Sequence, residues 1–431
     1  MNSPDAAGVK YQVVCVCGGY GFPLGNASAA RIIMVGKTLQ AAGIGFRVLH
    51  CGPSPMAIND QKRGVYEGIP FEYTTCVRRP KNKFIRLLAY ARALVGLTMH
   101  LAQLKRVRHS SLVYLYIMDG PLNLYTGVLC QLLGVPLAQE LCEWYPALNS
   151  SPVFNQWLYK KRVFKAATGA LVISKSIEDK VRERGWKVNP DLVVQRLPVL
   201  VDTQRFAAVN PDIQTSNKQV PNFLYCGAWL RDILFLVSSF AQVRLRGYSS
   251  TLTIVGHSDE KSSRVIFEHA EKKGISPADV LLTGCVDYFT IASLNRTATA
   301  LLMPLWNDEK SLTRLPNKMG EYLASGRPVI TSNIGDLTDF LFDNLNAYVG
   351  EAGSEREFTD RMIAVLCDPE RATQIGVAGQ RTCLAHLDYR SHVTKLSGFV
   401  SDCIATYNQR STPHNPSYGE ENAWGEMRQN S

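Results

Sequence analysis

The chain alternates short apolar runs with helical patterns, and this alternation occurs twice. The first series of predicted strands is Lys10–Cys17, Phe46–Cys51, Ser111–Ile117, Val135–Gln139 and Thr168–Ile173. The second series is Asn222–Cys226, Thr251–Val255, Val280–Leu282, Ala300–Met303 and Val329–Thr331. Strands that alternate with helices form parallel sheets through βαβ units. The sequence therefore predicts an α/β chain with two doubly wound halves.

A polar stretch separates the two series. Residues 207–221 contain two prolines and no clear periodicity, which is typical of a linker. We expect a first domain over 1–206, a second over 222–385, a helix over 386–409 that packs back toward the first domain, and a disordered tail over 410–431. Ligands of doubly wound folds bind at the carboxyl ends of the strands, so the site should lie between the halves.

Composition narrows the class of protein. The chain is 46% hydrophobic and 19% charged, which is typical of a soluble globular protein. It has no stretch of about 18 uncharged apolar residues, so no membrane-spanning helix is expected. The N-terminus has neither a basic region nor an apolar run, so no secretory signal is expected. The 11 scattered cysteines form no Cys-x-x-Cys pair and predict reduced, buried thiols in a cytoplasmic protein, without a metal site.

The net charge of +10 is concentrated in one segment. Between Glu72 and Asp119 there is no acidic residue, whereas nine basic residues occur: Arg78, Arg79, Lys81, Lys83, Arg86, Arg92, Lys105, Arg106 and Arg108. No groove-reading motif accompanies them, so an anionic membrane surface is a better candidate partner than nucleic acid. The apolar stripe at 84, 87, 88, 91, 94, 95, 98 and 101 predicts a helix that either packs in the core or lies on a membrane surface. We favour burial of the stripe, with the flanking cations touching phospholipid.

The segment Thr313–Ser332 carries the strongest functional signal. Pro316 suits the first turn of a helix, and Gly326 suits the position just beyond its end. Residues 319, 320 and 323 would form the buried face of this helix, whereas Lys318 and Glu321 would lie next to each other on another of its faces. A helix N-terminus attracts phosphate, and a carboxylate one turn later suits a ribose diol. An ordinary amphipathic helix with a solvated Lys–Glu pair explains the same pattern equally well.

Several separated segments together resemble the retaining glycosyltransferases of family 4. They are residues 24–31, 171–176, 198–206, 224–232, 253–256 with 281–284, and 313–332, in the family's order and spacing over roughly 10–400. The resemblance implies the GT-B fold, in which two Rossmann-like domains face each other. It implies that the first domain binds the acceptor, the second binds a UDP- or GDP-linked sugar, and neither a cofactor nor a metal is needed.

The resemblance also implies roles for particular residues of the second domain. Glu321 matches the second glutamate of the family's Glu-x7-Glu motif, which binds the ribose, whereas Thr313 stands in place of the first. Asp308 or Glu309 is a candidate substitute. Arg231 and Lys318 would bind the diphosphate and act in catalysis. The remaining donor-site candidates are Gly25 and Asn26 in the N-terminal loop of the first domain, and Gly227, His257, Leu315 and Pro316 in the second.

Two acids of the first domain are candidates for the acceptor side. Glu143 precedes an aromatic–Pro pair, as in some family members, and Asp119 lies in a loop that faces the same site. Both are catalytic candidates: Glu143 would activate or orient the acceptor hydroxyl or stabilise positive charge on the sugar. A carboxylate that caps a loop is an equal alternative for Glu143. The resemblance predicts transfer to a saccharide or lipid-linked saccharide. The alternatives are a non-catalytic GT-B subunit and a nucleotide-sugar epimerase, with a nucleic-acid-binding protein as a more distant one.

Overall fold

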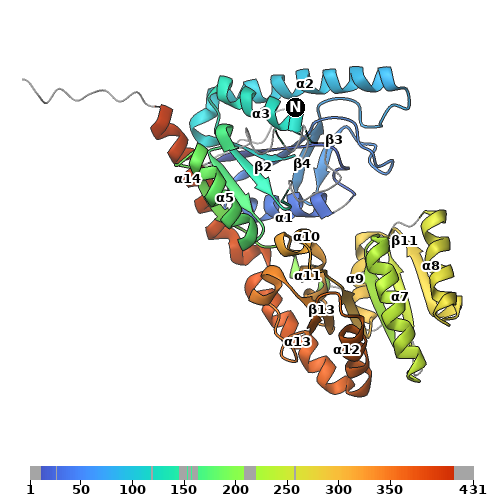
Figure 1. The fold of residues 1–431 in the computed structure, drawn as a ribbon. Coiled ribbons are helices and arrows are strands. Elements are labelled where there is room, and N and C mark those ends of the chain that lie inside the picture. Colours follow the sequence, from blue (N-terminus) through green and yellow to red (C-terminus); the bar gives the residue numbers. More distant parts are fainter. Residues whose placement is uncertain are drawn as a thin grey trace, which may run out of the picture.

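The computed structural model describes residues 11–25, 27–117, 120–144, 153, 157, 164–207, 220–256 and 259–411. It contains two α/β domains, one above the other in Figure 1. The predicted linker and the predicted tail lie mostly outside these residues. Each domain is built on one sheet, so the two-domain α/β architecture expected from the sequence is confirmed.

The first domain has an eight-stranded sheet in the order β3-β4-β2-β1-β5-β6-β7-β8. All neighbouring strands are parallel except β3, which is antiparallel to β4. The bounds are β1 Gln12–Cys17, β2 Gly45–His50, β3 Arg63–Tyr66, β4 Ile69–Tyr73, β5 Ser111–Tyr116, β6 Leu137–Leu141, β7 Gly169–Val172 and β8 Val193–Arg196. Strands β3, β4 and β8 were absent from the sequence prediction.

Alternate side chains of β1 enter two different cores. Val13 and Cys15 pack with α1 (Ala27–Ala41) and α14 (Val393–Ser411) on one face of the sheet. Val14 and Val16 pack with α2 (Lys83–Leu104) and α3 (Gly120–Leu133) on the other. Because successive side chains of a strand point to opposite faces of the sheet, both faces are covered by helices, and the domain has three layers: helices, sheet and helices. Helices α5 (Lys175–Val188) and α6 (Thr203–Ala207) complete it.

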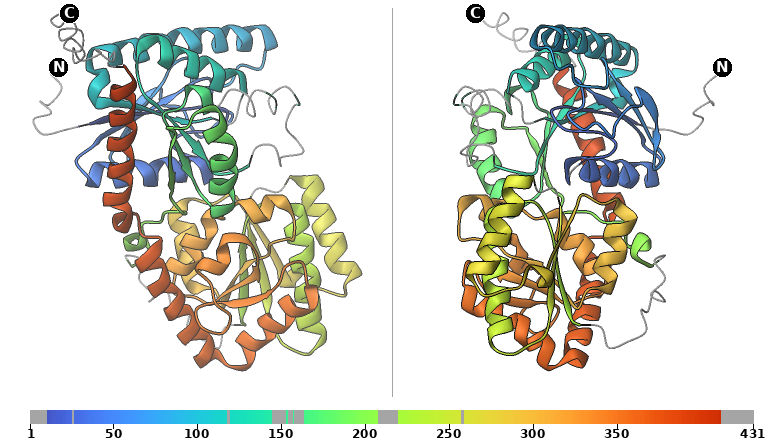
Figure 2. Two further views of the ribbon diagram at one scale, coloured as in Figure 1. Left: turned by 60° about the vertical axis from the view of Figure 1, so that its left-hand side comes forward. Right: turned by 90° about the vertical axis from the view of Figure 1, so that its right-hand side faces the viewer.

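The second domain has a fully parallel sheet of six strands in the order β11-β10-β9-β12-β13-β14. The strands are β9 Asn222–Cys226, β10 Thr251–Val255, β11 Val280–Gly284, β12 Ala300–Met303, β13 Val329–Asn333 and β14 Tyr348–Glu351. The helices are α7 Leu230–Leu245, α8 Glu260–Lys272, α9 Tyr288–Thr297, α10 Glu309–Thr313, α11 Asn317–Ala324, α12 Glu355–Cys367 and α13 Pro369–His386. After α13 the chain returns to the first domain, where α14 lies along it (Figure 2).

Two sequence predictions are wrong. The predicted apolar stripe of α2 mostly faces outward, since Phe84, Leu87, Leu88 and Val95 are exposed. The face that packs on the sheet carries Ala89, Ala93, Leu97, Leu101 and Leu104. This face packs inward because its small residues let α2 approach the sheet closely. A Cβ at Gly96, for example, would lie only 2.5 Å from the Thr74 carbonyl oxygen. The cysteines are all free, as predicted, but Cys76, Cys285 and Cys367 are exposed.

Candidate functional site

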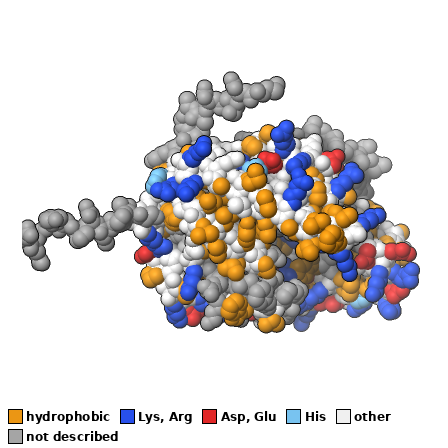
Figure 3. Space-filling model, turned by 90° about the horizontal axis from the view of Figure 1, so that it is seen from above, with side chains coloured by type: hydrophobic (Ala, Val, Ile, Leu, Met, Phe, Trp, Pro, Cys, Tyr) orange, Lys and Arg blue, Asp and Glu red, His pale blue; other side chains and the backbone are white. Residues whose placement is uncertain are grey.

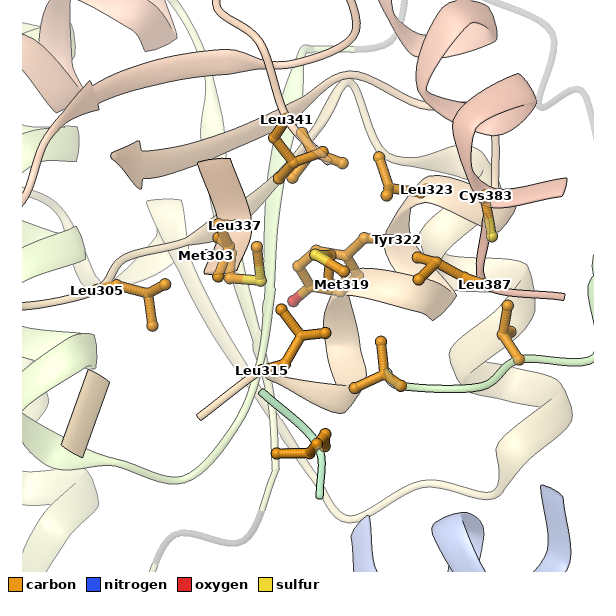
Figure 4. Packing of buried hydrophobic residues seen from close by; sticks show 14 of the residues in the cluster. Met303, Leu305, Leu315, Met319, Tyr322, Leu323, Leu337, Leu341, Cys383 and Leu387 are labelled. Atoms are coloured by element: carbon orange, nitrogen blue, oxygen red, sulfur yellow. The ribbon is translucent and has the colours of Figure 1, made fainter. Parts of the chain in front are cut away.

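Helix α11 has the structure that its sequence predicts. It begins directly after Pro316 and ends before Gly326, whose φ of 75° suits a residue without a Cβ. Met319, Tyr322 and Leu323 lie on its buried face, where they pack toward Leu337, Leu341 and Cys383 (Figure 4). This packing fixes the helix, so its polar face is held in a defined position.

The polar face of α11 carries Lys318 and Glu321, both half-buried. Burial raises the pKa of Glu321 to about 7, although Arg205 and Lys318 act in the opposite direction. Burial lowers the pKa of Lys318 to about 8, against the charges of Asp232 and Glu321. Both shifts place the groups near their titration points at neutral pH, which is common at functional sites. These shifts favour the interpretation of α11 as part of a binding site over its interpretation as an ordinary amphipathic helix with a solvated Lys–Glu pair.

Asp232, on the first turn of α7, organises the neighbouring aromatic rings. Its buried carboxylate accepts a hydrogen bond of 2.9 Å from the Tyr225 hydroxyl and one of 2.8 Å from the Trp306 indole nitrogen. Tyr225 comes from β9, and Trp306 from the loop after β12. Three elements are thus joined at the carboxyl end of the second sheet, because a buried carboxylate requires such donors.

Cations lie over the aromatic rings of this region. The Arg231 guanidinium lies 3.8 Å from the centre of the Trp306 ring, and the Lys318 ammonium 4.0 Å from that of Tyr225. Trp229 has Lys310 at 3.2 Å and Arg314 at 5.2 Å from its ring centre. Ring faces attract cations. The described residues thus hold four cations around the Asp232 cluster, which is the charge that a diphosphate requires.

Within the part of the chain that the structure describes, Arg314 has a donor that is not used. Its Nε is buried and has no hydrogen-bond partner among the described residues. A buried, unpaired donor is costly unless something binds it. Arg314 also lies close enough to Lys318 that each repels the other's charge, which contributes to the lowered pKa of Lys318. An anion placed between them would relieve both costs.

Thr313, which stands in place of the motif glutamate, is held by hydrogen bonds at the end of α10. The Thr313 hydroxyl donates to the Glu309 carbonyl at 2.8 Å, and the Thr313 carbonyl accepts from Ser174 of the first domain at 2.6 Å. Of the two candidate substitutes, Glu309 pairs with Lys180 at 2.9 Å. Asp308 caps α10 and pairs with Arg231 at 2.9 Å, so it lies beside the cation cluster. Of the two candidates, Asp308 is therefore the one that contacts the cation cluster.

Glu143 of the first domain lies close to the cation cluster of the second domain. Glu143 follows β6 and is half-buried, and its charge acts on Lys310 from across the domain boundary. Burial lowers the pKa of Lys310, and Glu143 opposes that shift more strongly than any other group. Glu143 therefore lies close enough to Lys310, at the edge of the cation cluster, for the two charges to interact.

A buried ion pair supports the loop of Glu143. Arg31 on α1 binds Glu140 with Nη2 at 3.2 Å and also donates to the Leu197 and Pro198 carbonyls. Glu140 further accepts from Tyr114 and from Cys142. Cys142 stands where family members often have histidine, and here its thiol is a donor to Glu140. The end of β6 is thereby tied to the segment after β8.

Arg205, on α6, links Glu321 of the second domain electrostatically to Glu67 of the first domain. Its guanidinium lies 4.8 Å from the centre of the Tyr288 ring and pairs with Glu67, which also binds Lys37 at 2.8 Å. Its charge is the larger of the two that lower the pKa of Glu321. Arg205 belongs to the 198–206 segment of the family resemblance, but sequence reasoning gave it no role.

The other sequence candidates divide into two groups. Gly227 is within the site: a Cβ there would meet the Tyr225 hydroxyl at 2.5 Å, so only glycine fits. Leu315 is buried, Pro316 caps α11, and Gly25 is exposed beside the loop before α1. Asn26, Asp119 and His257 lie outside the described residues. Sequence reasoning missed Arg314, which lies within the quoted 313–332 segment, and Lys310, which lies just before that segment.

A hollow of about 440 Å³ lies at the ends of β13 and β14 and is lined partly by Asp343, Glu351 and Glu357. Its carboxylates would repel phosphate. The cation cluster is therefore the better anion site of the two. It can hold a diphosphate, offer Glu321 to a diol and present Glu143 to a second substrate from the other domain.

Comparisons with known proteins support the fold and relate the second domain to a known family. Residues 220–368 match the family Glycosyl transferases group 1. Similar solved structures include a sucrose-phosphate synthase from Thermosynechococcus elongatus (TM-score 0.70, 16% identity, covering 91% of this chain and 99% of that one). A glycosyltransferase from Rickettsia africae has a TM-score of 0.66 at 15% identity, and the match covers 92% of this chain and 99% of that one. HepE from Anabaena, solved with UDP and glucose, has a TM-score of 0.67 at 12% identity, and the match covers 91% of this chain and 99% of HepE. No curated protein sequence matches the chain.

Proposed function

We propose that this chain, which has the GT-B fold and a glycosyl transferases group 1 domain over residues 220–368, transfers a sugar from a nucleoside-diphosphate donor to an acceptor hydroxyl. The acceptor is a saccharide or a lipid-linked saccharide, in cytoplasmic polysaccharide or glycoconjugate synthesis. The observation that carries the proposal is the group of cations around Asp232 beside Glu321. Diphosphate and ribose are the parts that all such donors share, and this site offers a partner to each.

The donor is placed by matching its groups to these side chains. Glu321 accepts hydrogen bonds from the two ribose hydroxyls, and Arg231, Lys318 and Arg314 bind the diphosphate. The sugar then points toward Asp308 and Glu143. HepE was solved with UDP and glucose and also with UDP-glucose, which supports testing a UDP-linked donor first.

The chemistry follows from this placement. The acceptor oxygen bonds to the anomeric carbon as the bond from that carbon to the diphosphate oxygen breaks. Negative charge grows on the leaving diphosphate, so the cations stabilise the transition state more than the bound donor. A donor phosphate oxygen takes the hydroxyl proton on the face from which it departs, which retains the anomeric configuration. Glu143 orients the acceptor hydroxyl, and the cations perform the neutralisation that a metal would otherwise supply.

A thermal-shift screen of nucleotide sugars tests the donor half of this proposal. A ligand at a hundred times its dissociation constant stabilises the native state by about 2.7 kcal/mol, which raises the melting temperature by a few degrees. We expect one UDP- or GDP-linked sugar to do so in the native chain. Glu321→Gln should show a much smaller shift at the same concentration. If no nucleotide sugar changes the melting temperature, the donor site is wrong.

A further inference from the structure

Helices α2 and α3 expose apolar side chains on the same side of the first domain. On α2 these are Phe84, Leu87, Leu88, Val95 and Met99, each more than half exposed. On α3 they are Leu124, Val128 and Leu132, spaced four residues apart. Figure 3 looks onto this side and shows hydrophobic side chains gathered over it, with Lys and Arg around them. We call these eight residues the α2–α3 face.

Helix α2 is apolar on two opposite sides. The side with Ala89, Ala93 and Leu97 is buried against the sheet, and the exposed residues lie across the helix axis from it. A surface helix of a soluble domain normally turns a polar side to water. The exposed side of α2 therefore suits a partner that removes it from water.

Cations border this face without compensating acids. Eight of the nine basic residues between Arg78 and Arg108 are exposed, and Arg86 is half-buried. The segments before and after α2 hold Arg78, Arg79, Lys81, Lys105 and Arg106. A surface that is apolar in the middle and cationic at its ends complements an anionic headgroup layer above an acyl region.

We propose that the α2–α3 face binds an anionic lipid bilayer. Its apolar side chains enter the boundary between headgroups and acyl chains, and the flanking cations bind lipid phosphates. The segment Lys83–Ser110 is long and apolar enough to cross a membrane by length and composition. It lies on the surface instead, because Ala89, Ala93 and Leu97 are fixed in the core of the domain.

A second copy of this chain is a poorer occupant of the face. A symmetric dimer brings the same patch of each subunit together, so the cations of one copy would meet those of the other. Like charges at close range repel. A bilayer instead supplies the opposite charge over an extended plane. Membrane binding would also keep the first domain, which holds Glu143, at the surface where lipid-linked acceptors are found.

Vesicle co-sedimentation tests this surface separately from sugar transfer. The probes are vesicles of phosphatidylcholine alone and of phosphatidylcholine with an equal amount of phosphatidylglycerol. We expect the native chain to bind only the anionic vesicles and to be released as salt rises from about 0.05 to about 0.5 M. The triple variant Leu87→Gln, Leu88→Gln, Val95→Gln should bind at least about tenfold more weakly. Reversal of Arg78, Arg79, Lys81 and Lys83 to Glu should weaken binding by about a hundredfold or more.

A matched control uses equally exposed apolar residues of the second domain, Leu245→Gln, Leu281→Gln and Phe289→Gln. It should bind vesicles like the native chain, and all variants should keep the native melting temperature and nucleotide-sugar shift. The proposal is overturned if the native chain ignores anionic vesicles, binds neutral ones equally well, or loses no binding in the α2 variants. It is also overturned if light scattering finds a dimer that the triple variant abolishes. None of these outcomes bears on the donor site.

Discussion

Replacing Arg231 or Lys318 by alanine is expected to lower kcat by about 10²–10³-fold while KM for the donor changes by less than about tenfold. The two cations approach the site from different sides, over Trp306 and over Tyr225. Charge on the leaving diphosphate grows toward the transition state, so each cation contributes most at that point. Steady-state kinetics with varied donor concentration separate the two constants.

Arg246→Ala is the matched control for this prediction. Arg246 ends α7, is exposed, and pairs with Asp360 at 2.7 Å, far along the helix from Arg231. It should keep native kcat and KM. Arg231→Lys and Lys318→Arg should each restore part of the lost turnover, because they keep a positive charge. Full turnover in both alanine variants would show that the diphosphate binds elsewhere.

Glu321→Gln is expected to weaken donor binding by about 1.5–3 kcal/mol, because a neutral amide replaces the carboxylate that accepts from two hydroxyls. Isothermal titration with the nucleotide sugar found in the thermal screen measures this loss. The native affinity should rise as pH increases through about 7, where Glu321 ionises, and fall above about 8, where Lys318 loses its proton. The Glu321→Gln variant should not show the rise of donor affinity with increasing pH.

The same variant should gain stability when no donor is bound. Burial raises the pKa of Glu321 from 4.5 to about 7, so the folded chain holds this proton more tightly than the unfolded chain. Ionisation therefore costs folding free energy, increasingly from pH 4.5 to 7, with a constant cost above. At about 1.4 kcal/mol for each pKa unit, Glu321→Gln should be up to about 3 kcal/mol more stable at pH 8 and unchanged below pH 4.5. Urea unfolding at the two pH values checks this; unchanged affinity and stability would remove Glu321 from the site.

The segment around α11 could be predicted from sequence because its signals are local. Pro316, Gly326 and the spacing of residues 319, 320 and 323 act within a few residues of one another, and the helix has the predicted bounds within one residue. Arg231 and Lys318 could be proposed for the same reason, since each lies at a fixed distance from a strand end in the family pattern. The structure brings both to the Asp232 cluster.

Other features depend on tertiary packing and could not be predicted. The periodicity of α2 revealed an apolar stripe but not which side meets the sheet, and that side was decided by the small residues Ala89, Ala93 and Gly96. Nothing in the local sequence places Lys310 over Trp229 and within reach of the charge of Glu143 from the other domain; the fold does so. Arg205 reaches Glu67 across 138 positions of chain. Such contacts leave no periodic signal.

A transfer assay with radiolabelled nucleotide sugars and a pool of saccharide and lipid-linked acceptors tests the central claim most directly. The account predicts that label passes to an acceptor, that one nucleoside diphosphate is released for each sugar transferred, and that the new bond keeps the donor's anomeric configuration. Glu321→Gln should slow the transfer. Label recovered as a free or isomerised sugar without an acceptor would identify an epimerase. Intact donor with measurable binding but no transfer to any acceptor would identify a non-catalytic subunit, and either result would contradict the account.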